Sequence, residues 1–216
     1  MIILAIDTAL SACSAAVLAG GRVLAAGSEP MVRGHQERLA PMVAEVMAEA
    51  GIDFRKLDRI GVTAGPGSFT GLRVGLAFAK GLSLALDAPA VGIGSLEALA
   101  RLLPPKEARP DEVVAACVDA RRGQVYLQVF RDGRAWDEPQ AASAEDAVVE
   151  IQRIAGDRHI QLAGSGAAIL APHLPRAGIS SAQVPDPVVV ARLAAAAEPR
   201  PLAPIYLRAP DAKLPA

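Results

Sequence analysis

The chain begins with Met1–Thr8, MIILAIDT, a short branched apolar run that ends in an aspartate and a threonine. Such a run is typical of a central strand that is buried on both faces of its sheet. Two more apolar runs follow, Ser14–Leu18 and Arg22–Ala26, and Ala19–Gly21 between them predicts a hairpin turn. We therefore expect the chain to open with three strands that pair antiparallel.

Beyond these strands, helices and strands are expected to alternate as far as residue 103. Gly51 is placed to end the first helix as its C-cap, and Ser95 is placed to begin the last helix as its N-cap. The order of elements in the first half is therefore predicted to be βββαβαβα. The elements after the opening strands are a helix over Glu37–Ala50, a strand over Arg59–Thr63, a helix over Phe69–Leu86, a strand over Ala90–Ile93 and a helix over Ser95–Leu103.

The second half of the chain repeats this pattern after a proline-rich stretch that predicts a linker. It begins with an apolar strand, Val113–Val118, that is followed by Asp119, as the first strand is followed by Asp7. The pattern indicates an α/β protein with a duplicated lobe, and two unrelated α/β lobes remain the alternative. The later elements expected are a strand over Val125–Phe130, a helix over Ala144–Ala155, a strand over Ile160–Ala163 and a helix over Val188–Ala197. The resulting division is an N-terminal lobe at 1–103, a C-terminal lobe at 104–198 and an extended tail at 199–216.

The composition of the 216 residues excludes several classes of protein. Hydrophobic residues make up 52% and the net charge is only −1, whereas disordered chains are less apolar and more charged. Because the chain has neither a basic excess nor many aromatic residues, simple electrostatic or stacking binding of nucleic acid is not expected. Cys13 and Cys117 are expected to be reduced core residues of a cytoplasmic protein. No membrane span is expected, because Lys80, Asp87 and Glu97 interrupt the best apolar stretch.

A glycine-rich loop, Gly65–Gly71 (GPGSFTG), lies between a predicted strand and a predicted helix, where backbone N–H groups can bind an anion. The loop lacks the lysine of a P-loop and the spacing of a dinucleotide fingerprint, so a tight, closely packed turn is the alternative to phosphate binding. Asp7 could hold a metal bound to phosphate, or it could satisfy local N–H groups. The residues considered for nucleotide or phosphate contact are Asp7, Thr8, Gly65, Gly67 and Ser68.

The three histidines, His35, His159 and His173, show no spacing typical of metal ligands, so no metal site is predicted. The G-x-S-x-G turn of serine hydrolases is absent from the sequence as well. No catalytic residue is therefore assigned. Arg121-Arg122 lies in a predicted hairpin turn, where solvated surface is the simplest interpretation.

The two long helices of the first half carry more apolar surface than one sheet needs. On a helical wheel, the apolar residues of Glu37–Ala50 cover an arc of roughly 200°, whereas a helix packed on one side needs little more than about 100°. In Phe69–Leu86 the only charges are Arg73 and Lys80, and small residues recur every four positions. An intermolecular helical interface is predicted, with full coverage by the second lobe as the alternative. The interface residues assigned are Leu39, Met42, Val43, Val46, Met47, Ala50, Gly71, Leu72, Val74, Gly75, Phe78 and Ala79.

Several motifs resemble those of the TsaB (YeaZ) family, and they extend over almost the whole chain. The block GPGSFTGLRVG at Gly65–Gly75 is highly specific when it is joined to DARRGQVY at Asp119–Tyr126. The resemblance implies two ribonuclease-H-like lobes of the actin/hexokinase/Hsp70 (ASKHA) type. The other matching segments are Asp7–Ala9, His35–Pro41 and Tyr206–Arg208.

The resemblance also implies a function. TsaD, the related enzyme, attaches threonylcarbamoyl to adenosine 37 of tRNAs that read ANN codons, and it binds a metal through a pair of histidines. Ser95 and Leu99 stand at the two matching positions here, and neither side chain can replace an imidazole as a metal ligand. The family therefore implies a non-catalytic subunit that binds TsaD and acts together with the ATPase TsaE.

Further expectations follow from the same resemblance. ATP and metal are expected on the partner subunits, and tRNA is expected to be contacted only indirectly. The alternative to solvated surface for Arg121-Arg122 is that these residues, or the Gly65 loop, contact nucleotide or tRNA at the interface with the partner. The two long helices are expected to pair the chain with a second copy when TsaD is absent, so the two assemblies should compete for one surface. The alternatives are a nucleotide-dependent enzyme of the same fold, an ATPase or kinase that uses Asp7 and the Gly65 loop, and a glycoprotease homologue of the M22 type, which no nucleophile, base or metal constellation supports.

Overall fold

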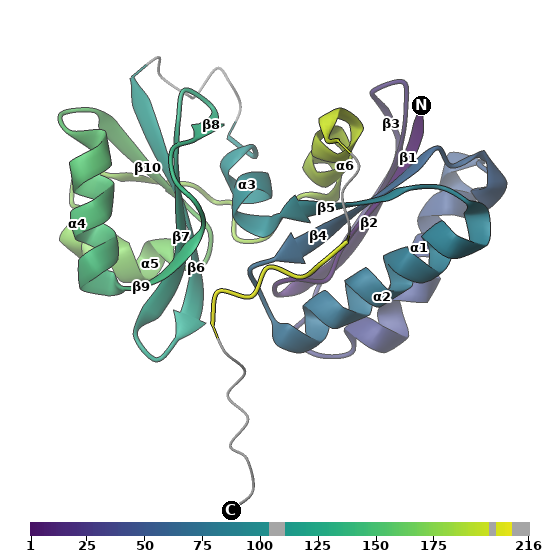
Figure 1. Cartoon of the computed structure of the whole chain (residues 1–216), viewed down its shortest axis with the longest axis horizontal. Helices are drawn as coiled ribbons and strands as arrows, with labels where there is room; N and C mark the ends of the chain where they lie inside the picture. Colours follow the sequence, from purple (N-terminus) through teal and green to yellow (C-terminus); the bar gives the residue numbers. More distant parts are fainter. Residues whose placement is uncertain (104–110, 199–201, 209–216) are drawn as a thin grey trace, which may run out of the picture.

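The computed structural model describes residues 1–103, 111–198 and 202–208, which form two mixed sheets with helices on their faces (Figure 1). The first sheet has the order β3-β2-β1-β4-β5. Its first three strands pair antiparallel, as predicted, and β4 and β5 continue the sheet parallel to β1. The strands are β1 (Ile2–Asp7), β2 (Ala12–Ala19), β3 (Arg22–Pro30), β4 (Arg59–Gly65) and β5 (Ala90–Gly94).

β1 is the central strand of this sheet and is buried on both faces, which confirms the prediction made from its branched apolar run. Leu4 and Ile6 point into a core beneath α1 (His35–Ala50) and α2 (Phe69–Leu86). Ile3 and Ala5 point to the opposite face, beneath α6 (Pro187–Ala196). The alternation follows from the two-residue period of a strand.

Local sequence signals set the ends of the helices. Gly51 adopts a left-handed conformation with φ of 65° and ends α1, as predicted. The hydroxyl of Ser68 caps α2 by accepting a hydrogen bond of 3.3 Å from the N–H of Gly71. The prediction that Ser95 is an N-cap is wrong, because Gly94 occupies the cap and Ser95 is the first, buried residue of α3 (Ser95–Ala100). A one-turn 3₁₀ helix, η1 (Phe54–Lys56), joins α1 to β4.

The second sheet repeats the topology of the first. Its order is β11-β10-β6-β7-β8, with β6, β7 and β8 antiparallel and β10 and β11 parallel to β6. The same order and the same pairing in both sheets support the predicted duplication. The elements are β6 (Glu112–Arg121), β7 (Gln124–Arg131), β8 (Arg134–Ala135), β9 (Gln140–Ser143), α4 (Ala144–Ala155), β10 (His159–Ala163), α5 (Ala167–Leu170), η2 (Ala171–His173) and β11 (Gly178–Ile179), with β9 paired to β7.

The turn between β6 and β7 has an unusual backbone. Arg121, Arg122 and Gly123 all have positive φ, at 66°, 55° and 73°. The N–H of Arg121 donates a hydrogen bond of 2.7 Å to Asp119, which fixes the start of the turn. The Arg121 side chain is 82% exposed, which both interpretations of this turn require.

The last helix, α6, packs against the first sheet, whereas the predicted division placed it in the C-terminal lobe. Gly61 of β4 makes this contact possible, because a Cβ there would lie 2.7 Å from the Cβ of Ala194. Arg59 holds the end of the helix, since its Nη1 donates hydrogen bonds of 2.7 and 2.8 Å to the carbonyls of Ala194 and Ala197. The predicted linker at 104–110 and parts of the predicted tail, 199–201 and 209–216, lie outside the described residues.

The described end of the chain, residues 202–208, crosses between the two sheets, as the yellow segment in Figure 1 shows. The N–H of Ile205 donates a hydrogen bond of 2.7 Å to the carbonyl of Ala64, at the end of β4. Arg208 then donates from Nη1 to the carbonyl of Ala120 in β6, at 2.9 Å. This segment therefore ties the first sheet to the second.

By length and composition alone, α2 could cross a membrane. Its packing argues for a helix of a folded domain instead. Leu72, Leu76 and Ala79 belong to the core over the first sheet, and the charged residues Arg73 and Lys80 are exposed on its outer side. A lipid-facing helix would have to bury these two charges in hydrocarbon.

Candidate functional site

The Gly65–Gly71 loop is packed against the turn that follows β1. A Cβ at Gly67 would lie 2.3 Å from the carbonyl oxygen of Ala9, and a Cβ at Gly71 would lie 2.0 Å from that of Thr8. The N–H of Ser68, which could have faced an anion, donates a hydrogen bond of 2.7 Å to Ala9. The loop therefore has the contacts of a closely packed turn, which was the alternative to phosphate binding.

Asp7 lies behind this loop and is fully buried. Its Oδ1 accepts hydrogen bonds from the N–H of Ala9, at 3.0 Å, and from the hydroxyl of Thr63. Its Oδ2 is buried and has no hydrogen-bond partner among the described residues, and burial raises the pKa of the carboxyl from 3.8 to about 6. The five residues considered for phosphate contact are thus brought together, but Asp7 and Thr8 are sealed from solvent by the start of α2.

The two positions that the family resemblance compares with a pair of metal-binding histidines are also closed to solvent. Ser95 and Leu99 are fully buried in α3, and a Cβ on Gly164 would lie only 3.1 Å from the Leu99 side chain. Within residues 1–103, 111–198 and 202–208, no three His, Cys, Asp or Glu side chains are grouped as metal ligands. Cys13 and Cys117 are free and buried, as predicted, and desolvation raises their thiol pKa values to about 11 and about 12.

Most residues assigned to the partner interface face this chain's own first sheet, which corrects the assignment. The wide apolar arc that the helical wheel gave these helices includes the side of α1 and of α2 that packs on the sheet. The small-residue stripe of α2 has the same explanation, because a Cβ at Gly75 would lie 2.6 Å from the hydroxyl oxygen of Thr8. Ala50, Val74 and Phe78 are the assigned residues that stay partly exposed. The buried ones are Leu39, Met42, Val43, Val46, Met47, Gly71, Leu72, Gly75 and Ala79.

The outward side of α2 is the surface that remains for a partner, and we call it the α2 ridge. Leu84 is 89% exposed and Phe69 is 39% exposed, although both are large apolar residues. The sequence indicates this outward side through the spacing of Arg73, Ala77, Lys80 and Leu84. These residues recur every three or four positions and so lie on one side of the helix. The α2 ridge consists of Phe69, Arg73, Ala77, Lys80 and Leu84.

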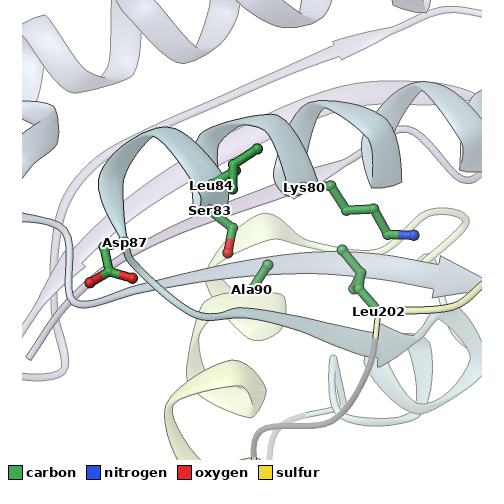
Figure 2. Close-up of a pocket in the computed structure, with 6 residues that line it drawn as sticks. All are labelled: Lys80, Ser83, Leu84, Asp87, Ala90 and Leu202. Atoms are coloured by element: carbon green, nitrogen blue, oxygen red, sulfur yellow. The ribbon is translucent and has the colours of Figure 1, made fainter.

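Two grooves flank the α2 ridge. One, of about 490 Å³, runs between α1 and α2 and is lined largely by apolar side chains, among them Leu39, Val74 and Phe78. The other, of about 430 Å³, lies between α2 and β5 (Figure 2). Figure 2 shows Lys80 and Asp87 near opposite ends of this second groove, with Ala90 and Leu202 below the helix. A ridge between two grooves suits a partner helix that packs along α2.

At the start of the α2 ridge, the end of the chain adds an aromatic residue. The guanidinium of Arg73 lies 3.7 Å from the centre of the Phe69 ring, and the rings of Phe69 and Tyr206 are 5.4 Å apart. The Nε of Arg73 donates to the hydroxyl of Tyr206 at 3.4 Å. Residues far apart in sequence therefore build one exposed cluster of two rings and a cation.

Comparisons with known proteins agree with this architecture. The family model described as TsaD, tRNA N6-adenosine threonylcarbamoyltransferase, matches residues 28–198. The protein of Haemophilus influenzae named tRNA threonylcarbamoyladenosine biosynthesis protein TsaB is 39% identical over 131 residues, which are 60% of this chain and 54% of that protein. The protein of the same name from Escherichia coli is 35% identical over 162 residues, 73% of this chain and 69% of its own length.

Solved structures with the same arrangement of elements identify the type of fold. YeaZ from Pseudomonas aeruginosa is 29% identical with a TM-score of 0.78, and the match covers 95% of this chain and 99% of that one. A ROK hexokinase from Thermus thermophilus shares the fold at 15% identity, with a TM-score of 0.51 over 90% of this chain and 99% of that one. The architecture is therefore the predicted ASKHA type of α/β fold. On these matches, the chain belongs to the TsaB (YeaZ) family, several of whose curated members are named for tRNA threonylcarbamoyladenosine biosynthesis.

Proposed function

We propose that this chain is an accessory, non-catalytic subunit that binds a TsaD homologue and supports the formation of N6-threonylcarbamoyladenosine at position 37 of tRNAs that read ANN codons. The observation that carries the proposal is the α2 ridge. It keeps Leu84 and Phe69 exposed on a helix whose other side is already packed on the sheet. An exposed apolar surface of this kind marks a site of association. The docking surface is then the outward side of α2 and the groove beside α1.

The absence of catalysis is part of the proposal, and buried side chains support it. Ser95 and Leu99 lie in the core at the positions where TsaD has metal ligands, and Asp7 is sealed beneath α2. ATP and metal would then belong to the partner subunits. The net charge of −1 supports only an indirect role in holding tRNA.

The wider assembly is proposed on the family resemblance. The ATPase TsaE would join the complex of this chain with the TsaD homologue in the cytoplasm. A second copy would occupy the same helices when the TsaD homologue is absent, and the two assemblies would exclude each other.

The test is to mix the purified full chain with the TsaD homologue of the same genome. Co-elution in size exclusion and threonylcarbamoyl transfer to tRNA are the two readouts. Leu84→Glu is the informative variant, because this side chain is 89% exposed and its replacement leaves the core intact. The expected result is loss of co-elution and of transfer together.

The matched control is Val149→Glu, since Val149 is an apolar residue of α4 that is 64% exposed on the other sheet's helix. It should bind and support transfer like the unchanged chain. Ala77→Glu provides a second substitution on the α2 ridge. If both ridge variants co-elute normally with the TsaD homologue, the proposed docking surface is wrong.

A further inference from the structure

We propose that the α2 ridge selects a partner helix with two carboxylates about two turns apart, one opposite Arg73 and one opposite Lys80. The inference rests on the proposed function, because it specifies the chemistry of the partner that docks on α2. It commits to one occupant, an acidic helix of a different protein, and it is argued from the charges on the outward sides of α1 and α2.

Arg73 and Lys80 stand in the middle of the α2 ridge, beside Ala77 and Leu84. They are seven residues apart, which separates them by about 10 Å along the helix and keeps them on one side of it. α2 itself contains no acidic residue. Neither cation forms an ion pair with a carboxylate in the part of the chain that the structure describes. The apolar ridge thus presents two uncompensated positive charges.

Arg73 is already held in a geometry that suits a carboxylate. One face of its guanidinium is stacked on Phe69, and its Nε is directed to the hydroxyl of Tyr206. No acceptor among the described residues bonds to its two Nη atoms, which are the pair that binds a carboxylate in a bidentate manner. Because the side chain is ordered before binding, less conformational entropy is lost when the partner docks.

A second copy of this chain matches the two cations incompletely. Between two antiparallel α2 helices, Asp87 at the C-cap could face Arg73, but Lys80 would then face Lys80 of the other copy. On its α1, Glu45 already accepts hydrogen bonds of 2.9 and 2.8 Å from the two Nη atoms of Arg38. The remaining exposed carboxylates, Glu37 and Glu49, are twelve residues apart, or about 18 Å, against about 10 Å for Arg73 and Lys80. The charge spacing therefore favours a different protein over self-association.

The charges give the two assemblies opposite responses to salt. Attraction between the α2 ridge and an acidic helix weakens as salt screens it, so the complex with the partner should dissociate more readily at high ionic strength. Pairing of α2 with α2 of a second copy carries repulsion, which salt relieves. The sign of the salt effect thus distinguishes the two occupants without any variant.

The experiment measures the dissociation constant of the full chain and the TsaD homologue at about 50 mM and about 300 mM NaCl, a range over which screening changes strongly. Arg73→Glu, Lys80→Glu and the double variant are compared with Arg176→Glu, an exposed arginine of the other sheet's surface. At low salt each ridge reversal should weaken binding about tenfold, and the double variant should bind about a hundredfold more weakly. Arg176→Glu should bind as the unchanged chain does.

Leu84→Glu separates this inference from the proposed function. If Leu84→Glu abolishes binding while both charge reversals leave the dissociation constant unchanged at either salt concentration, the docking surface stands and the acidic partner helix is refuted. If all three variants bind normally, the docking surface on α2 is wrong as well, whereas the proposed function fails only if the unchanged chain does not bind the TsaD homologue. If the reversals change only the self-association of the chain, the occupant is a second copy and the inference is overturned.

Discussion

Thr8 donates a hydrogen bond of 2.7 Å from its hydroxyl to the carbonyl of Gly71, which fastens the turn after β1 to the first turn of α2. The two segments approach so closely that Cβ atoms at Gly71 and Gly75 would lie 2.0 and 2.6 Å from oxygen atoms of Thr8. Both glycines are therefore required by the fold of this chain. The start of α2, which begins the α2 ridge, is fixed in place by this contact.

Gly71→Ala is expected to lower the free energy of unfolding by about 2 kcal/mol or more, because the added methyl group meets the backbone of Thr8 and the helix must shift. Gly81→Ala is the matched control on the same helix, since nothing lies within 4 Å of a Cβ there. It should stabilise the chain by up to about 1 kcal/mol through helix propensity. Urea unfolding of both variants checks the prediction, and equal stabilities would contradict it.

This contact also explains how far the sequence could predict the site. Periodicity and turn residues predicted α2 within its observed bounds, because both act over neighbouring residues. The recurrence of Gly71, Gly75 and Ala79 was interpreted as a surface for another helix. Periodicity cannot tell whether small residues admit a partner or the chain's own backbone, which here is Thr8. The exposed side of α2 could have been predicted from the sequence, because Arg73 and Lys80 lie on one side of the helix.

Asp7 is expected to make stability fall as the pH rises. The pKa of its carboxyl is about 6 in the folded chain, whereas the unfolded chain has the ordinary value of 3.8. The folded chain therefore binds the proton more tightly than the unfolded chain does. The stabilisation from protonation is present at low pH and is lost as the pH rises from about 4 to about 6.

Asp7→Asn tests this, because the amide keeps the Oδ1 acceptor and cannot ionise. The stability of the variant relative to the unchanged chain should be greater by about 1 kcal/mol at about pH 7.5 than at about pH 5.0. Urea unfolding at the two pH values gives this difference directly. A relative stability that stays constant with pH would mean that Asp7 is not the titrating group.

The two thiols are expected to be unreactive in the folded chain. Cys13 and Cys117 are both buried, and desolvation raises their pKa values to about 11 and about 12, so almost no thiolate is present near neutral pH. A thiol reagent such as DTNB should modify neither residue in the native chain and both after unfolding in urea. Rapid modification of either thiol without denaturant would contradict the described burial.

Arg59 is expected to hold α6 on the first sheet. Its Nη1 donates to the carbonyls of Ala194 and Ala197, at the end of the helix where carbonyls lack partners, and these contacts are partly buried. Arg59→Met keeps the apolar stem and removes the donors. Hydrogen bonds from a charged group are worth about 1.5–3 kcal/mol each, so a loss of about 2 kcal/mol in the free energy of unfolding is expected.

Hydrogen exchange locates the effect. In Arg59→Met, protection should fall first in α6 and only slightly in α4, because α4 packs on the other sheet. Arg55→Met is the control, because the Arg55 side chain is 88% exposed and its Nε lies 3.8 Å from Oδ1 of Asp53. It should leave both helices protected. Unchanged protection of α6 in Arg59→Met would mean that these hydrogen bonds do not hold the helix on the first sheet.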